Sequence, residues 1–378
     1  MNSVPSTQPY GQLDPASSKN FWSSYAGLAS DSTDVLIAEA RLLGHGHVKE
    51  AYVGSTCDGH VWKLTSDEGV HLRGTDKSPF PLGFFSAAMA ADLIQWGIKE
   101  NVLARTAELR ITSPYSMTGS FASGTAKGFA YPPLVELSDS SKQDVKTSIC
   151  FDNFYRSHLT GQFLREQIEG GFSLSVNGRQ RPLSMLRFVD PNGVLDPFLK
   201  YQVPPTVLAA SRADAITKSA IPEPGDTKSI QSSGVIKRNV CVLASWSEQY
   251  LEMESWLVLP GVSRFLFRSN PLHSGPQGDS SPYPKPSVYL SAGLIFCYMT
   301  QLSRYIEALK LKIDGIRAVQ IVKCSTNQKP NIESHLFINA RENFESIEHL
   351  LSVAQNTCYL HAVARSPLEL MLTATNSS

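Results

Sequence analysis

The sequence has no net charge, no long apolar run and no C-x-x-C pair, and each absence argues against a class of function. Lysine plus arginine equal aspartate plus glutamate at 34 each among 378 residues, so no broad basic surface for nucleic acid is expected. No apolar stretch reaches the roughly 18–20 residues that a membrane span needs. The N-terminus lacks the basic start and apolar segment of a secretory signal. We therefore expect a cytoplasmic protein with neither a nucleic-acid nor a membrane partner.

The cysteines are too few and too scattered for a disulfide scaffold or a zinc site. There are six in the chain: Cys57, Cys150, Cys241, Cys297, Cys324 and Cys358. In a reducing compartment they should be free thiols, and a pair that does oxidise there is more typical of catalysis than of structure. Cys57 and His60 have ligand-type side chains but lack further ligands, so we expect no bound metal and no bound cofactor. Cys57, Cys150, Cys241 and Cys324 are expected to be packing residues.

The order of strand-like and helix-like segments occurs twice along the chain. In each half, β-branched strand segments precede a long apolar helix, at 78–102 and at 287–312, and further strands and a second helix follow. Such alternation predicts an α+β fold with two similar modules. The expected divisions are a flexible N-terminal arm at 1–30, a first module at 31–180, a linker at 181–233 and a second module at 234–378.

Counting residues aligns the two long helices. Eleven positions separate Pro81 from Asp92, and eleven separate Pro286 from Cys297. Asp92 therefore occupies the place in the first half that Cys297 has in the second. An unpaired carboxylate in a buried helix costs several kcal/mol, so Asp92 must be paired, protonated or near water. It is either an acid/base or substrate anchor in a modified site, or the remnant of a lost site, hydrogen-bonded to neighbours such as Gln95.

The second half resembles the OsmC and organic hydroperoxide resistance (Ohr) family. The segment "LSAGLIFC", Leu290 to Cys297, is similar to the motif of that family's central helix, and Cys358 lies near the end of a second helix, where the family has another cysteine. Tyr359 stands where a proline is usual. The resemblance is weak over 34–180 and better over 235–376. It implies two modules, each an antiparallel sheet with a long buried helix and a second helix, packed as an intramolecular pseudodimer.

The same resemblance implies a thiol peroxidase-like oxidoreductase. Cys297 would attack the O–O bond of an organic hydroperoxide, Cys358 would resolve the sulfenic acid, and an external dithiol would reduce the disulfide. The expected partners are a small hydrophobic substrate and this thiol reductant, with the chain a monomeric pseudodimer or a homodimer. His361 follows Cys358 by three positions on one helix face, so it either tunes the thiol and acts as an acid/base or is an ordinary core or surface histidine.

The sequence departs from the peroxidase pattern in the groups that activate the thiol. That branch of the family uses an arginine from the loop after the first strand and a glutamate ten residues before the cysteine, where this chain has Ser287. The first half's loop offers His45, His47 and Lys49 as replacements.

Two other functions remain open. One is a repurposed biosynthetic enzyme, with Cys297 as the nucleophile on a bulky apolar metabolite and Asp92 or a histidine as acid/base. The other is a non-catalytic protein that binds a hydrophobic ligand. The charged patches at 66–69 and 237–239 are expected to be solvated surface, and the glycine-rich segment at 119–128 a hairpin or lid.

Overall fold

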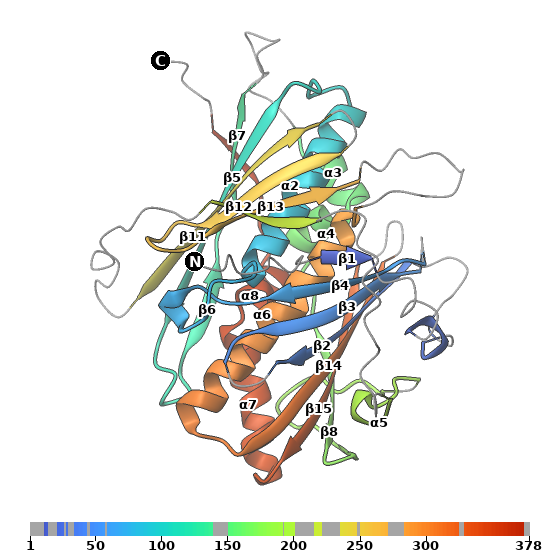
Figure 1. Cartoon of the computed structure of the whole chain (residues 1–378), viewed down its shortest axis with the longest axis vertical. Helices are drawn as coiled ribbons and strands as arrows, with labels where there is room; N and C mark the ends of the chain where they lie inside the picture. Colours follow the sequence, from blue (N-terminus) through green and yellow to red (C-terminus); the bar gives the residue numbers. More distant parts are fainter. Residues whose placement is uncertain are drawn as a thin grey trace, which may run out of the picture.

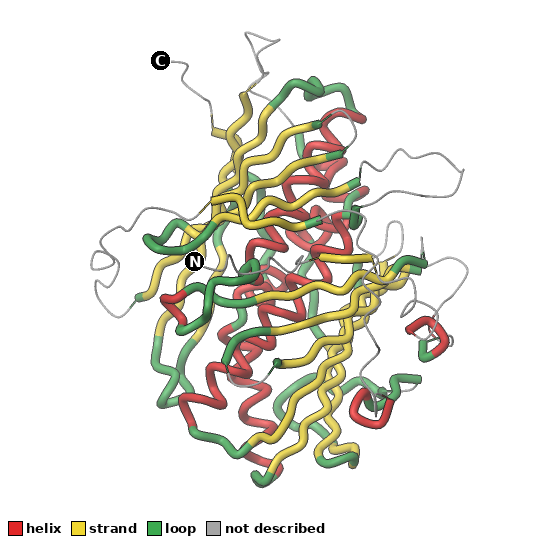
Figure 2. Tube along the Cα trace, in the orientation of Figure 1, coloured by secondary structure: helices red, strands yellow, loops and turns green. Residues whose placement is uncertain are grey.

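Two long helices lie between two β-sheets in the computed structural model of the chain (Figure 1). Helix α2 spans Pro81–Lys99 and helix α6 spans Pro286–Leu309. In Figure 2 these helices run through the middle of the molecule, and strands lie to either side. The structure describes residues 11–13, 21–25, 28, 34–43, 46–56, 59–138, 150–191, 193–200, 215–220, 235–247, 250–270, 283–324 and 329–373.

Each long helix begins at a proline and is apolar on nearly all sides. Pro81 and Pro286 occupy the first turn, where a missing N–H costs no intrahelical hydrogen bond. Nearly every residue of α2 and most of α6 are buried, which is the environment that a helix without a polar face requires. Helix α2 packs on the sheet that contains β11 (Ile236–Trp246), and α6 packs on the sheet that contains β2 (Asp34–Leu42).

The strands of the two halves are interleaved in two eight-stranded sheets. The first sheet has the order β1 (Gly11–Leu13), β4 (Val61–Ser66), β3 (Lys49–Ser55), β2, β14 (Ile313–Cys324), β15 (Asn331–Ala340), β8 (Gly171–Val176) and β9 (Arg179–Arg181). The second has the order β10 (Ile216–Ala220), β13 (Arg264–Ser269), β12 (Leu251–Leu257), β11, β5 (Glu108–Thr118), β7 (Leu134–Ser138) and β16 (Met371–Thr373), with β6 (Lys127–Ala130) paired to β5.

The mixed α+β class is confirmed, but the predicted module sheets need correction in two respects. Strand β2 pairs with β14 and strand β5 pairs with β11, so each sheet takes strands from both halves of the chain. The pairs β15–β8 and β16–β7 are parallel, so neither sheet is purely antiparallel. Both joins bury strand edges that one half alone would leave unpaired.

A broken helix follows β7 in the first half and β15 in the second half. In the first half α3 (Asp152–Ser157) ends and α4 (Leu159–Arg165) begins at His158. In the second half α7 (Phe344–Thr357) ends and α8 (Tyr359–Arg365) begins at Cys358. Both junction residues have extended backbone angles, which interrupts the helical hydrogen bonds and points the chain in a new direction.

Parts of the predicted arm and linker are ordered elements. Phe21 and Tyr25 are buried against the outer face of the first sheet, so this part of the predicted flexible arm is packed. The predicted linker contains α5 (Pro197–Lys200) and β10, which extends the second sheet beyond β13. Among the described residues, none of the helices combines the length and apolar character needed to cross a bilayer.

Gly293 sets how closely α2 and α6 approach, which gives a stability prediction. A Cβ at this position would lie 3.0 Å from the Phe85 nitrogen and 3.2 Å from the Pro81 oxygen, both backbone atoms of α2. Gly293→Ala should therefore lower the free energy of unfolding by about 1–3 kcal/mol in a denaturant titration, as overpacking typically does. Gly83→Ala, whose Cβ would meet only the Phe80 ring, is the matched control and should change the free energy of unfolding little. Equal stability of both variants would contradict the close crossing.

Candidate thiol site

The two cysteines singled out by the sequence face each other in the folded chain. The sulfur atoms of Cys297 and Cys358 lie 3.3 Å apart, and both thiols are buried and free. Cys297 lies in the middle of α6, and Cys358 lies at the junction of α7 and α8, which pack on α6. A disulfide has an S–S distance of about 2.05 Å, so a bond between them requires only a small approach. The fold thus brings together two thiols that are 61 positions apart in the sequence.

The environments of the two sulfurs differ, so their acidities differ as well. Burial raises the pKa of the Cys297 thiol well above its usual value, and the contact with Cys358 adds to this rise. Burial also raises the pKa of Cys358. The net shift is nevertheless well below the usual value, because Cys358 accepts a hydrogen bond from the Cys297 thiol and interacts with His361 by charge and hydrogen bonds. The two thiols therefore titrate as a pair, in which the surroundings favour negative charge on Cys358 over Cys297.

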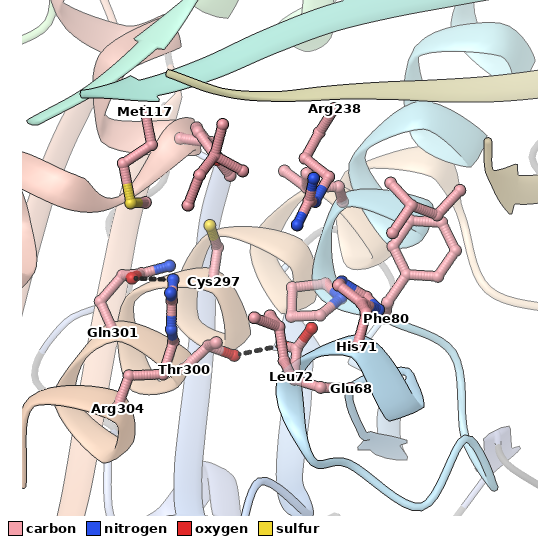
Figure 3. A pocket seen from close by; sticks show the side chains of 15 residues that line it. Glu68, His71, Leu72, Phe80, Met117, Arg238, Cys297, Thr300, Gln301 and Arg304 are labelled. Carbon is pink, nitrogen blue, oxygen red and sulfur yellow. Dashed lines mark hydrogen bonds between the residues drawn. The ribbon is translucent and has the colours of Figure 1, made fainter. Parts of the chain in front are cut away.

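Cys297 is the member of the pair that reaches a cavity. The cavity has a volume of about 70 Å³ and lies between the two sheets beside α6 (Figure 3). Cys358 is fully buried and is not part of its wall. A small molecule in the cavity therefore meets Cys297 first. The wall consists of Glu68, His71, Leu72, Phe80, Pro81, Leu82, Met117, Ile236, Arg238, Leu257, Cys297, Thr300, Gln301, Arg304 and Tyr359.

A buried ion pair from the first half lies beside this thiol. Lys49 on β3 is completely buried, and its Nζ lies 3.3 Å from Glu68 Oε1 and donates to Thr300 Oγ1 at 2.8 Å. Thr300, one turn after Cys297, donates to Glu68 Oε1 at 2.6 Å. Burial lowers the pKa of Lys49, and Glu68 opposes this shift by favouring the ammonium. The Lys49 ammonium attracts negative charge on the Cys297 sulfur, whereas the Glu68 carboxylate raises the pKa of Cys297.

Asp92 lies in the matching position of the first half, away from this cavity. Its Oδ2 accepts hydrogen bonds from Thr160 Oγ1 at 2.7 Å and from the Thr160 N–H at 3.3 Å, and its Oδ1 lies 3.7 Å from His158 Nδ1. The carboxylate is therefore paired, as its burial required. Gln95, named above as one possible partner of Asp92, donates instead to the Asn270 carbonyl.

The remaining histidine and cysteine predictions have mixed outcomes. His361 lies beside Cys358 although the helix breaks at Cys358, and its ring is stacked on Phe172 with ring centroids 5.9 Å apart. His47 is buried, and its Nδ1 lies 3.1 Å from Ser303 Oγ. Lys49, another of the proposed replacements, contacts Glu68 and Thr300.

Several of the other residues singled out in the sequence lie elsewhere or cannot be placed. Cys150 is exposed, so the expectation that it is a packing residue is wrong, whereas Cys241 is buried. Cys57 and His45 lie outside the described residues. Within the described part of the chain, no three His, Cys, Asp or Glu side chains gather in a metal-binding arrangement.

The prediction that two charged patches are solvated surface is wrong for the patch at 66–69 and for Arg238, whereas Lys237 and Asn239 are exposed. Glu68, from the patch at 66–69, is buried, and Arg238, from the patch at 237–239, lines the cavity. The alternation of strand residues provides a signal for Arg238, because Ile236 and Val240 share its face and point inward. No local signal marks Glu68, since it follows β4 in a loop and meets Lys49 only after the sheet and α6 have packed.

Comparison with known proteins gives little similarity. Neither a protein-family model nor a curated protein sequence matches the chain. Part of the chain is similar to a solved structure, an OsmC-like hydroperoxide resistance protein from Jannaschia sp. CCS1, with 19% sequence identity and a TM-score of 0.19. The match covers 32% of this chain and 81% of that protein. We therefore base the functional proposal on the geometry of the site.

The ion pair predicts strongly non-additive effects on stability. Lys49→Met leaves the Glu68 carboxylate buried without its cation, and it should lower the free energy of unfolding by about 3–5 kcal/mol. The double variant Lys49→Met, Glu68→Gln should recover much of this loss, because it removes both charges. Urea titrations of the two single variants and the double variant measure the coupling. Additive losses would contradict a direct ion pair.

Proposed function

We propose that this chain is a thiol-dependent enzyme of the OsmC/Ohr type, arranged as an intramolecular pseudodimer, that reduces organic hydroperoxides. The observation that carries the proposal is the 3.3 Å contact between Cys297 and Cys358, with only Cys297 at the wall of a mainly apolar cavity. A thiol that meets the substrate and a second thiol within bonding reach of it are the two parts of a resolving dithiol mechanism.

The reaction divides into two balanced steps. In the first, the Cys297 thiolate attacks the terminal oxygen of the hydroperoxide, the O–O bond breaks, and Cys297 becomes a sulfenic acid while the alkoxide takes up a proton to give the alcohol. In the second, the Cys358 thiolate attacks the Cys297 sulfur, an S–S bond forms, and hydroxide leaves and is protonated to water. The dithiol loses two electrons, the hydroperoxide gains them, and an external dithiol restores both thiols by exchange.

The first step requires that Cys297 lose its proton, and two neighbouring groups favour this loss. The Cys358 sulfur, which holds negative charge more readily, lies close enough to accept that proton across the 3.3 Å contact. The alkoxide formed in the first step then takes this proton from Cys358, which restores the Cys358 thiolate for the second step. The Lys49 ammonium, held by Glu68 and Thr300, favours negative charge on Cys297. Lys49 thereby takes the place of the arginine that the sequence lacks at the family position, and Glu68 holds Lys49 there. His361 holds negative charge on Cys358 and keeps it ready for the second step.

Thiol mapping by mass spectrometry tests this proposal. After one equivalent of cumene hydroperoxide, the reduced protein should form a Cys297–Cys358 disulfide, and Cys358→Ser should instead accumulate a sulfenic acid at Cys297 that dimedone traps. Cys297→Ser should abolish peroxide consumption, whereas Cys241→Ser, which removes another buried free thiol, should leave it unchanged.

Other results would support a different function. If both thiols stay reduced while iodoacetamide alkylates Cys297 selectively, a repurposed enzyme with Cys297 as nucleophile replaces the peroxidase. If Cys297 resists alkylation as well, the chain is a ligand-binding protein with inherited cysteines.

A further inference from the structure

Two arginine side chains reach the cavity from opposite sides. Arg238 extends from β11 of the second sheet, and Arg304 lies two turns after Cys297 on α6. Figure 3 shows both guanidinium groups directed toward the space into which the Cys297 sulfur points. Each one is half-buried, and each feels the charge of the other.

Neither guanidinium has a carboxylate partner among the residues that the structure describes. Arg304 Nη1 donates to the amide oxygen Oε1 of Gln301 at 3.1 Å, and its guanidinium lies over the Phe121 ring with its Cζ 4.0 Å from the centroid. Arg238 Nη1 donates to the backbone oxygen of Lys237 at 2.8 Å. These contacts hold the two side chains in place but leave their charges uncompensated.

The other titratable groups at the cavity do not balance these charges. The Glu68 carboxylate already pairs with Lys49, although it also acts on Arg304. Burial lowers the pKa of His71 to about 4 and raises the pKa of Tyr359 to about 12, so both are uncharged near pH 7. A single thiolate in the cysteine pair compensates only one of the two guanidinium groups. The cavity therefore has an excess of positive charge beside an apolar wall, which favours an anionic ligand.

We propose that the cavity binds a small organic molecule with an anionic group, a carboxylate or a phosphate, placed between Arg238 and Arg304. Guanidinium groups are well suited to both anions because their N–H groups match the oxygen pairs of the ligand. The apolar part of the ligand lies against the apolar wall residues Leu72, Phe80, Leu82, Met117, Ile236 and Leu257. The cavity volume of about 70 Å³ limits the enclosed part to a few carbon atoms beside the anionic group.

For turnover, this inference rests on the proposed function and narrows its substrate class. The substrate becomes an organic hydroperoxide that also carries an acid group, rather than a neutral one. Arg238 and Arg304 then orient the molecule so that its peroxide oxygen meets Cys297, and they act as binding residues whose effect depends on the charge of the substrate.

Ligand binding to an unreactive protein tests the inference without any peroxide chemistry. Titration calorimetry of the full chain with Cys297→Ser and Cys358→Ser would compare hexanoate, hexyl phosphate and hexan-1-ol. At least one anion should bind about tenfold or more tightly than the alcohol, because charge-assisted hydrogen bonds to arginine are stronger than neutral ones, and the preference should weaken as salt rises. The tighter anion identifies the acid group. Equal binding of the alcohol and both anions would overturn the inference.

Substitutions in the same background assign the preference to the two arginines. Arg238→Gln and Arg304→Gln should each remove most of the preference for the anion, and Arg304→Lys, which keeps the charge, should retain part of it. Arg110→Gln, on the same sheet as Arg238 but paired with Glu136 on the surface, is the matched control and should change nothing. Unchanged preference in folded Gln variants of Arg238 and Arg304, with folding checked by circular dichroism, would overturn the assignment.

A turnover measurement separates this inference from the proposed function. With all cysteines present, an acidic hydroperoxide should have a higher kcat/KM than cumene hydroperoxide, with the difference mainly in KM. Anion binding without any peroxide consumption would uphold the anion site and overturn the peroxidase. Consumption of cumene hydroperoxide without preference for an acid would uphold the peroxidase and overturn the anion site.

Discussion

The close crossing of α2 and α6 at Gly293 is the contact on which the rest of the molecule depends. Because residue 293 has no side chain, the backbone of α2 lies against α6, and the two helices form one buried unit between the sheets. Cys297 follows Gly293 by one helical turn, so the crossing also fixes the depth of the thiol. A wider separation would displace both sheets, and with them the Lys49 and Glu68 side chains that lie beside the thiol.

The exchange of strands makes the site a joint product of the two halves. The strands of the first half that carry Lys49 and precede Glu68 pack over the helix of the second half, and β11 of the second half joins β5 of the first. The cavity is therefore lined by Glu68 and Met117 from one half and by Arg238, Cys297 and others from the second. Neither half contains the thiols, their ion pair and the arginines together.

In both halves, a residue in the long helix contacts the residue at the junction of a broken helix, but the side chains differ. In the second half, Cys297 faces the junction residue Cys358 and receives a backbone hydrogen bond from Leu360. In the first half, Asp92 faces the junction residue His158 and accepts the N–H of Thr160. Both geometries satisfy a buried polar atom, but an aspartate and a histidine cannot form a reversible covalent bond as two thiols do.

The sequence was sufficient for features that depend on local pattern. The two long helices were predicted from a proline at the start of each and from apolar residues on all sides, because both signals depend on short-range chemistry. The equal spacing to Asp92 and Cys297 predicted that these two residues occupy matched positions. The sequence also named Lys49 as one of three residues that could replace the activating arginine. The sequence could not predict which strands pair, since β2–β14 and β5–β11 join segments far apart in the chain.

The partners of individual side chains were also decided only by the tertiary structure. Glu68 and Arg238 belong to charged patches that were predicted to be solvated surface, but Glu68 is buried and Arg238 lines the cavity. Asp92 pairs with Thr160 rather than with its neighbour Gln95. Residue types and spacing determine what an element is and which face it buries. Distances between elements, such as the 3.3 Å between two sulfur atoms, depend on the packing of the whole chain.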